Sequence, residues 1–544
     1  MVAIAGGWNY GNILDAVAEV LPGEKPALIH GDTVRSWADF TRRTNNLARA
    51  LRARGVETGD KVAFYLRNHP AYLELLGACF KGRFTHVNVN YRYVDEELAY
   101  ILDNSDAKVV LFASEFAGHV RALKPRLPKV AVWVELTADG TPTVEGAVDF
   151  DALCEEGDGA PLGLERSGDD LLFLYTGGTT GMPKGVMWAH DDHWHAGTAG
   201  ATVATELVPP ASLAEHAENV RRAGGGARLM PCCPLMHGTG LFTAIGTLAQ
   251  GGSVVTLEGL SFDPEECLAA VDRWQVNGLA IVGDAFAKPL LRALDAADGK
   301  YDVSSLLSMV SSGVMWSMEV KQGLLRHNPA LVLTDSFGAS EAVGFGRSDT
   351  TVDGTVQTAR FVLGEHCKVF TEDFREVKPG DPEPGFVARA GAIPRGYYKD
   401  PEKTAKTFPV IDGVRYSMPG DWVRVEADGS LVLLGRGSVC INTAGEKVYP
   451  EEVEEVLKGH ASVDDALVVG IPDEKWGQMV TAVVQLHPGA SLDEEALRAH
   501  ARTHLAGYKT PKRILARETL GRASNGKADY KLITAWAKAQ LGVA

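Results

Sequence analysis

The chain has 544 residues, of which 45% are hydrophobic and 23% charged, and its formal net charge at pH 7 is -16. This length is too great for one hydrophobic core and favours roughly three or four folding units. The acidic balance argues against nucleic acid or an anionic membrane as a partner, and no apolar run is long enough to span a bilayer. No secretory signal is recognisable, and the seven cysteines are scattered without a Cys-x-x-Cys pair. We therefore expect a globular protein of the reducing cytoplasm, without a zinc site or a disulfide framework.

Helical and strand patterns alternate through the first 170 residues. Ser36 is a typical N-cap, the apolar residues after it repeat on one helical face, and Gly55 can end that helix. The alternation is typical of parallel sheets covered by helices. Residues 140–168, rich in Gly, Asp and Glu, predict a connection. The other elements expected here are strands over 61–66 and 108–112 and helices over 72–80 and 95–102.

Residues 189–229 lack clear periodicity and predict a surface excursion with one helix near 211–222. The segment His190–His195 contains three histidines and two aspartates, which raises the possibility of a metal cluster. It has no recognised helical ligand spacing, so a polar loop after a strand is favoured by about four to one.

Strand and helix patterns resume over 254–282, and residues 360–435 change to short strands and turns. After Gly435, a helix is expected over 450–459, strands over 466–471 and 479–486, and a helix over 492–505. About a hundred residues of mixed α/β pattern make a plausible small domain. We therefore expect one domain over residues 1–435 and a second over 436–544.

The segment Tyr175–Gly185, Tyr-Thr-Gly-Gly-Thr-Thr-Gly-Met-Pro-Lys-Gly, follows an apolar strand pattern. Its glycines let backbone amides approach a phosphate chain, and its threonines and Lys184 add donors and charge. An ordinary surface turn is the alternative, at about one in ten. The segment is not a standard phosphate loop, because Pro183 precedes the lysine and Gly185 follows it. It resembles the signature of the adenylate-forming superfamily: acyl-CoA synthetases, luciferases and the adenylation domains of peptide synthetases.

Downstream motifs extend this resemblance. Ser336–Glu341, Ser-Phe-Gly-Ala-Ser-Glu, is similar to the family's aromatic-Gly-x-Thr-Glu motif, and Ser311–Met315 is similar to its adenine-contacting turn, with Met315 where proline is usual. The family roles place Phe337 beside adenine, Ser340 near the α-phosphate and Glu341, with Thr179, on Mg²⁺. One glutamate suffices, because Mg²⁺ keeps waters and takes substrate phosphates. The residues that the resemblance assigns to ATP and AMP are Thr176, Gly177, Gly178, Thr179, Thr180, Gly181, Lys184, Gly313, Val314, Phe337, Gly338, Asp421 and Arg436.

Asp421, preceded by glycine, resembles the family's ribose-binding Thr-Gly-Asp. A turn aspartate is the alternative, at about one in four without its context. Gly435-Arg436 follows at the family spacing and favours the nucleotide role.

The stretch 435–454 is similar to a long family motif ending in Gly-Glu-x-Val-x-Pro-x-Glu-Val-Glu. Ser438 stands where most members carry a charged hinge residue, and a small polar residue can still absorb a backbone rotation. The resemblance places Gly445 and Glu446 at the CoA tunnel.

Lys527 closes the segment Gly521-Arg-Ala-Ser-Asn-Gly-Lys527. This is a phosphate-loop pattern except that Ala528 replaces Ser or Thr, so a phosphotransferase is an alternative; the short tail that follows argues against it. The family instead has a mobile lysine here that reaches the α-phosphate during adenylation. The resemblance therefore implies Lys527, Ser340 and Glu341 as catalytic residues.

His237 and Gly238, in Pro-Leu-Met-His-Gly-Thr-Gly, resemble the motif that lines the acyl pocket. A structural histidine is the alternative. Amino-acid activators carry an aspartate at the position of Gly238, so an amino-acid substrate is disfavoured. The segment Ile281–Lys288 departs from the common Val-Pro pattern and, with Gly178, is similar to an actinobacterial-type subgroup that includes activators of steroid side-chain acids. Asp284 is either a substrate contact or a turn or N-cap residue.

The resemblance implies an α/β fold: a large N-terminal adenylate-forming domain, with αβαβα-type layers and a small β-barrel-like subdomain, and a small mobile α+β C-terminal domain. It implies an acyl-CoA synthetase that uses ATP, CoA and Mg²⁺ on a steroid side-chain acid or a medium- to long-chain fatty acid, with rotation about Ser438 between half-reactions. A homodimer is a family-level expectation. The alternatives are an adenylate-forming enzyme with another acceptor, such as oxygen or a carrier protein, and a non-catalytic adenylate-binding protein.

Overall fold

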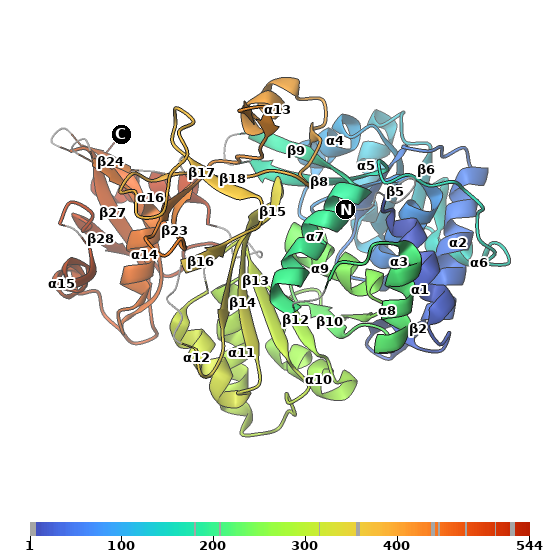
Figure 1. Ribbon diagram of the computed structural model, residues 1–544, viewed down its shortest axis with the longest axis horizontal. Coiled ribbons are helices and arrows are strands. Elements are labelled where there is room, and N and C mark those ends of the chain that lie inside the picture. The colour runs from blue at the N-terminus through green and yellow to red at the C-terminus, as the bar shows by residue number, and fades with distance from the viewer. Residues whose placement is uncertain are drawn as a thin grey trace.

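The computed structural model describes most of the chain. The described residues are 7–178, 181–205, 208–314, 316–354, 360–436, 441–443, 446–473, 476–505, 507–522 and 528–543. Within them the expected alternation of helices and strands produces an α/β molecule, with most of the N-terminal third of the chain, in blue, at one end and the C-terminal unit, in red, at the other (Figure 1).

The first sheet is built mainly from the N-terminal third of the chain. Parallel pairing joins its inner strands, as the strand–helix alternation predicts, and an antiparallel hairpin closes one edge. In sheet order its strands are β19 (Gly396–Tyr397), β9 (Gly181–Ala189), β8 (Leu171–Gly178), β4 (Thr85–Asn88), β3 (Lys61–Tyr65), β5 (Ala107–Ala113), β6 (Val132–Leu136) and β7 (Ala147–Asp149).

Helices cover this sheet, and one of them, Pro70–Gly82, is buried along its whole length. Helix α2 begins as predicted, since the Ser36 side chain accepts a hydrogen bond from the Asp39 amide, and Gly55 follows its end with φ +80°. Its apolar stripe, which includes Phe40 and Leu47, is fully buried. The helices of this part are α1 (Tyr10–Val20), α2 (Trp37–Ala53), α3 (Pro70–Gly82), α4 (Asp95–Asn104), α5 (Ala117–Leu123) and α6 (Phe150–Glu155), with short 3₁₀ turns at Ser114–Phe116 and Lys124–Arg126.

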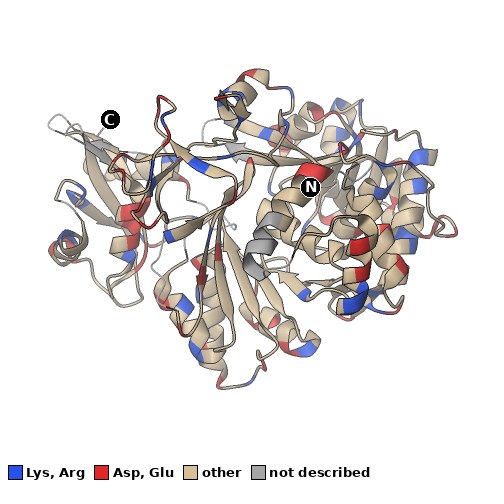
Figure 2. Ribbon diagram, in the orientation of Figure 1, with Lys and Arg blue, Asp and Glu red and all other residues tan. Residues whose placement is uncertain are grey.

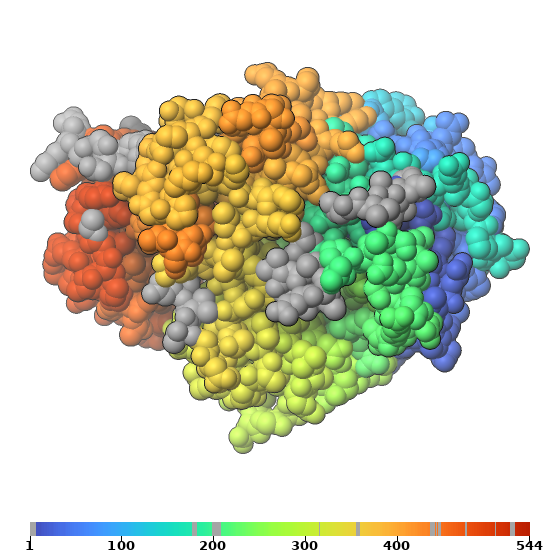
Figure 3. All heavy atoms as spheres, viewed as in Figure 1, coloured from blue at the N-terminus to red at the C-terminus, as the bar shows by residue number. Residues whose placement is uncertain are grey.

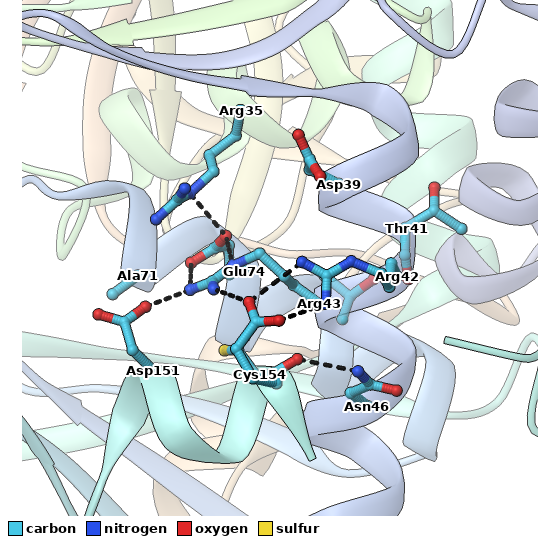
Figure 4. A network of polar contacts seen from close by, with 12 residues as sticks. Arg35, Asp39, Thr41, Arg42, Arg43, Asn46, Ala71, Glu74, Asp151 and Cys154 are labelled. Carbon is cyan, nitrogen blue, oxygen red and sulfur yellow. Dashed lines mark hydrogen bonds and ion pairs between the residues drawn. The ribbon is translucent and has the colours of Figure 1, made fainter. Parts of the chain in front are cut away.

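A buried ion-pair network ties α2 to α3 and α6 (Figure 4). Arg43 donates to both carboxylate oxygens of Glu74 at 2.6 and 3.1 Å, and it also donates to Asp151 and Glu155. The side chains of Arg43 and Glu74 are only 3% and 2% exposed. Such a pair is tolerated in the interior because each charge is matched and hydrogen bonded.

The second sheet, 13 strands in the part of the chain that is described, runs through the middle of the molecule. Its parallel half comes from residues before 340, and its antiparallel half is the region of short strands expected over 360–435. In sheet order its strands are β17 (Cys367–Phe370), β18 (Gly385–Arg389), β22 (Asp421–Val425), β23 (Leu431–Arg436), β16 (Arg360–Leu363), β15 (Ala342–Thr350), β14 (Val332–Ala339), β13 (Ser308–Ser312), β12 (Gly278–Ile281), β10 (Arg228–Pro231), β11 (Ser253–Thr256), β1 (Pro26–His30) and β2 (Thr33–Ser36).

A second group of helices lies around this sheet and beside the first one; those over residues 264–327 are below the large sheet in Figure 1. Its members are α7 (His190–Thr205), α8 (Leu213–Ala223), α9 (Gly238–Ala249), α10 (Pro264–Trp274), α11 (Asp284–Ala297), α12 (Met318–His327) and α13 (Pro401–Thr407), and a small hairpin, β20 (Val410–Ile411) and β21 (Val414–Arg415), follows α13.

Two connections predicted from the sequence are wrong. The segment His190–His195 is not a polar loop, because it forms the first turns of α7. His190 and His193 are buried, and the Tyr10 hydroxyl lies 2.6 Å from His193 Nδ1. The described part of the chain holds no group of three or more His, Cys, Asp or Glu that could bind a metal. Residues 140–168 are not a plain connection either, because they contain β7 and α6.

A separate sheet forms the core of the C-terminal unit, the orange-red lobe in Figure 3. Its strands, in order, are β25 (Glu446–Val448), β24 (Ile441–Thr443), β27 (Gly477–Leu486) and β26 (Val463–Asp473), with β28 (Arg513–Ala516) paired to β27. The helices α14 (Pro450–Lys458), α15 (Glu494–His504) and α16 (Tyr530–Leu541) pack on it. Helix α15 is capped by Asp493. The domain boundary at residues 435 and 436 stays a prediction; β23, the last strand of the large sheet, ends at Arg436.

Charges of both signs are interspersed over the helices and loops (Figure 2). Across the described ranges, none of the helices has the length and apolar composition needed to cross a membrane.

Candidate active site

A large cavity lies where the two large sheets and the C-terminal unit meet. Its volume is about 1810 Å³, whereas a typical small-molecule site occupies roughly 300–1,000 Å³. It can therefore hold a nucleotide and a bulky second substrate together. The predicted site residues that line it are Thr176, Lys184, His237, Gly238, Gly313, Val314, Phe337, Gly338, Ser340, Glu341 and Asp421.

Some predicted residues cannot be placed in this way. Thr179, Thr180, Ser438, Gly445 and Lys527 lie outside the described residues, and so does Met315. Gly177, Gly178 and Gly181 are in β8 and β9, and Arg436 and Glu446 are in β23 and β25, but the side chains of the last two are not described. The roles assigned to all of these residues stay predictions.

The glycine- and threonine-rich segment is a hairpin and not an extended loop. Thr176 pairs with Lys184 and Gly178 with Gly181, so both arms are strand. Lys184 forms an ion pair with Asp400 at the start of α13. The role of Lys184 at the nucleotide, which the resemblance implies, stays a prediction.

The Ser340–Glu341 turn is held from three directions. The Tyr397 hydroxyl donates to Glu341 Oε1 at 2.6 Å, and Ser417 Oγ donates to the Glu341 carbonyl at 2.6 Å. The indole of Trp188, on β9, donates to the Ser340 carbonyl at 2.9 Å. Because β9 also carries the glycine-rich hairpin, the turn and the hairpin are braced against each other.

The backbone at this turn requires glycine. At Gly338 a Cβ atom would lie 3.0 Å from the Ala342 carbonyl oxygen, where the ladder between β14 and β15 shifts register. The motif therefore continues a strand and does not begin a helix. Gly313, at the end of β13, has φ +88°, which favours glycine over any residue with a side chain.

Phe337 packs between Phe345 and Phe361, with ring centroids 5.4 and 5.2 Å away, and borders the cavity. Asp421 and Arg436 are direct partners in the ladder between β22 and β23. The large sheet thus brings two residues 84 positions apart to the cavity, Phe337 from β14 and Asp421 from β22.

At the end of the cavity that is predicted to bind the acyl group, His237 precedes α9 as its N-cap residue and Gly238 is the first residue of that helix. A Cβ atom at Gly238 would lie 3.2 Å from Leu174 Cδ2 and 3.6 Å from Phe242. Glycine therefore keeps this part of the cavity open between β8 and α9.

The C-terminal unit contributes a polar face to the cavity through Glu454, Arg522 and Tyr530. The Tyr530 hydroxyl donates to Glu454 Oε1 at 2.9 Å, and Arg522 pairs with Asp465. Burial raises the pKa of Glu454 to about 7. Arg522 and Ala528, which also lines the cavity, flank the segment that carries Lys527 in the sequence.

Asp284 has a different environment from the one expected. It is the first residue of α11, not the N-cap, and its Oδ1 accepts hydrogen bonds from the backbone amide and hydroxyl of Ser317. Burial raises its pKa, and Lys458 of the C-terminal unit opposes that shift. The segment Ile281–Lys288 thus approaches the C-terminal unit.

Sequence reasoning missed Asp335, Tyr397, Trp188 and Ser417. Asp335 directly precedes the Ser336–Glu341 motif, lines the cavity and forms an ion pair with buried Lys321; burial raises its pKa to about 6. Because Asp335 is adjacent to the motif in the sequence, it could have been predicted as a residue of the site. Trp188 and Tyr397 belong to β9 and β19, Ser417 lies between β21 and β22, and no local pattern marks these three.

Comparison with known proteins agrees with this geometry. A model of the AMP-binding enzyme family matches residues 14–398, and one of the AMP-binding enzyme C-terminal domain matches residues 452–527. The chain belongs to the AMP-binding enzyme family. The resemblance to adenylate-forming enzymes is therefore confirmed.

Relatives match over almost the whole chain. A 3-oxocholest-4-en-26-oate–CoA ligase of Rhodococcus rhodochrous is 40% identical over 550 residues, covering 98% of this chain and 96% of the relative. A medium/long-chain-fatty-acid–CoA/3-oxocholest-4-en-26-oate–CoA ligase of Mycobacterium marinum is 39% identical, with the same coverage. The crystal structure of an anthranilate CoA ligase in complex with anthranoyl-AMP superposes with a TM-score of 0.85 at 21% identity, covering 99% of both chains. The expected fold class, with a large N-terminal and a smaller C-terminal domain, is confirmed.

Proposed function

We propose that this AMP-binding enzyme is an AMP-forming acid–CoA ligase that activates a bulky apolar carboxylic acid. The observation that carries the proposal is the continuity of the cavity. One space joins the acyl end at His237 and Gly238, the nucleotide end at Glu341 and Asp421, and the polar face of the C-terminal unit.

The reaction takes place in two steps. In the first, a carboxylate oxygen of the acid attacks the α-phosphorus of ATP, the bond to the β-phosphate oxygen breaks, and acyl-adenylate and pyrophosphate form. In the second, the CoA thiol loses its proton and attacks the acyl carbon, and AMP leaves. Adenylation replaces a poor leaving group, hydroxide, by AMP, which divides one difficult substitution into two easier ones.

The residues of this chain bind and orient the nucleotide. Asp421 is positioned to accept hydrogen bonds from the ribose, and Phe337 provides an apolar face for adenine. The carboxylate of Glu341, braced by Tyr397, fits Mg²⁺, which takes one or two carboxylates together with phosphates and waters. Mg²⁺ bound there would neutralise charge on the ATP phosphates.

Lys527 is the proposed cation at the α-phosphate during the first step. The support is indirect: Arg522 and Ala528, on either side of it in the sequence, line the same cavity as Glu341. A lysine held there stabilises charge that develops in the transition state. Rotation of the C-terminal unit about Ser438 would then exchange Lys527 for the segment of Gly445 and Glu446 and admit CoA.

The acid is proposed to be a steroid side-chain acid or a medium- to long-chain fatty acid. The names of the two relatives and the size of the cavity that Gly238 lines support this choice. We further propose that the enzyme acts in the cytoplasm and forms a homodimer, as the family resemblance implies.

A panel of carboxylic acids, scored by AMP release with and without CoA, tests the proposal. Steroid and fatty acids should give CoA-dependent AMP release. If the acid supports ATP–pyrophosphate exchange but AMP release does not depend on CoA, the acyl group has a different acceptor. If ADP is the product, the enzyme is a phosphotransferase.

The Lys527→Ala variant tests the assignment of the catalytic cation. Adenylation should fall by about 10²–10³-fold, the typical loss for removal of one transition-state donor. Conversion of supplied acyl-adenylate to the thioester should remain. Unchanged pyrophosphate exchange in this variant would refute the assignment.

A further inference from the structure

The segment Ile281–Lys288, whose sequence departs from the common pattern, contacts the C-terminal unit. Lys288, on the second turn of α11, donates to the carbonyl of Asp464 and lies 3.3 Å from Asp464 Oδ1. Arg292, one turn further along α11, donates to the same oxygen at 3.2 Å. Two cations of the large domain therefore meet one carboxylate of β26.

A hydrogen bond within the C-terminal unit orients the Asp464 carboxylate for this contact. Gln485 Nε2, on the neighbouring strand β27, donates to Asp464 Oδ2 at 2.9 Å. That bond fixes the carboxylate plane and leaves Oδ1 directed to α11. On the other side, Lys288 lies 3.9 Å from Asp284 Oδ2, so a second carboxylate faces the same side chain.

The contact accompanies one orientation of the C-terminal unit. In this orientation Arg522, Ala528 and Tyr530 line the cavity together with Glu341 and Asp421. Ile441, Thr443 and Val448, whose side chains are described in β24 and β25, do not line it. Tyr449 and Glu451, which follow β25, line it as well. The observed orientation therefore brings the residues that flank Lys527 in the sequence to the cavity, as the adenylation step requires under the proposed function.

We propose that Lys288 and Arg292 are positioning residues for adenylation, which hold the C-terminal unit through Asp464 in the orientation that brings the Lys527 end to the cavity. This inference rests on the proposed two-step reaction. It assigns the unusual segment to domain orientation and not to recognition of the acid.

The strength of the contact suits a connection that must break in every cycle. Asp464 and Lys288 are 16% and 22% exposed and Arg292 is 63% exposed, so water and salt screen the pairs. A contact of this kind shifts the balance between two orientations without making either one permanent.

Charge reversal tests the proposal through the two half-reactions measured separately. Lys288→Glu and Asp464→Lys should each slow acid-dependent ATP–pyrophosphate exchange about tenfold at saturating ATP and acid, because the adenylation orientation becomes less populated. The formation of thioester from supplied acyl-adenylate and CoA should be unchanged or faster. Combining both substitutions should recover most of the exchange rate.

Lys300→Glu provides the matched control. It makes the same charge change just beyond α11, where the contacts of Lys300 are with Glu265 and Tyr301 of the large domain. Both half-reactions should keep their rates in this variant. If Lys288→Glu fails to fold, Arg292→Glu, at a more exposed position, should show the same selective effect with a smaller size.

Equal loss of both half-reactions in the reversal variants, or no loss of exchange, would overturn the proposal, and so would failure of the double variant to recover. These outcomes differ from failure of the proposed function, in which the unmodified enzyme would show no acid-dependent exchange with any acid of the panel.

Discussion

Two groups of ion pairs in this molecule have the same chemistry but differ in burial, and so in how easily they separate. Arg43 and Glu74 are almost completely buried and join helices of one domain through several hydrogen bonds (Figure 4). Lys288, Arg292 and Asp464 are partly exposed and join two units. Burial makes the first group permanent, because separating its charges would leave one of them unpaired in a medium of low polarity. Exposure makes the second reversible, because water replaces each lost partner.

The buried group should give the largest effect when it is broken. Glu74→Ala leaves the Arg43 guanidinium without its main buried partner and should reduce the free energy of unfolding by about 3–5 kcal/mol. Chemical denaturation measures this loss. Arg126→Ala, which removes the exposed pair with Glu96, is the control and should leave the denaturation midpoint nearly unchanged. A loss for Glu74→Ala no greater than that of the control would contradict the contrast.

Glu454 extends the comparison to a buried carboxyl group whose cationic neighbours are less close than Arg43 is to Glu74. Burial raises its pKa in the folded protein from the ordinary 4.5 to about 7. Between these values the unfolded chain loses the proton while the folded chain keeps it, so stability falls as pH rises from 4.5 to 7. Glu454→Gln should remove this slope and gain about 2–3 kcal/mol relative to the unmodified protein across that interval.

Denaturation at pH 5 and pH 8 measures the effect of Glu454→Gln. A constant offset from altered hydrogen bonds to Tyr530 and Val468 does not affect the difference between the two pH values. Parallel pH profiles for the two proteins would show that Glu454 is ionised in the fold throughout this range.

A hydrogen bond from a neutral group should have an effect of intermediate size. The Tyr397 hydroxyl is such a donor, and its acceptor is the Glu341 carboxylate in the cavity. Tyr397→Phe removes the hydrogen bond to Glu341 and should weaken binding of ATP with Mg²⁺ about tenfold, since hydrogen bonds to charged groups contribute roughly 1.5–3 kcal/mol. Calorimetric titration measures this affinity, and binding of AMP without metal should stay unchanged.

The neighbouring Tyr398 is the control for loss of a tyrosine hydroxyl. Its hydroxyl donates to Asp106 at 2.8 Å, and Tyr398 does not line the cavity. Tyr398→Phe should therefore keep the affinity for ATP with Mg²⁺. Equal weakening of AMP and ATP binding by Tyr397→Phe would indicate a general disturbance of the nucleotide site.

The smallest effect is expected from salt alone. Raising NaCl from about 0.1 to 0.5 M shortens the screening distance and should slow pyrophosphate exchange about twofold at saturating substrates. The thioester step should not slow in the same way. In Lys288→Glu this salt response should disappear. If it persists at full size, salt acts on an interaction other than the one between Lys288 and Asp464.

Local sequence patterns predicted much of the architecture. The N-cap at Ser36, the strand–helix alternation and the short strands after residue 360 depend on periodicity and turn residues, which act over a few positions. Most of the described residues that the family motifs identified, including Glu341 and Asp421, line the cavity. Helix α7 escaped prediction because its buried face consists largely of histidine, tryptophan and small residues, which carry no clear apolar period.

By itself, the sequence determined the family, the α/β class and the residue types available for adenylation, since these depend on motifs that are continuous in the chain. Only the tertiary structure decided that Tyr397, Ser417 and Trp188 brace the Ser340–Glu341 turn, and that Lys288 meets Asp464 across two units. The partners in these contacts lie far apart in the sequence: Tyr397 is 56 residues from Glu341, and Lys288 is 176 residues from Asp464. No local pattern encodes them, because they arise only when sheets and helices pack and bring distant side chains within hydrogen-bonding distance.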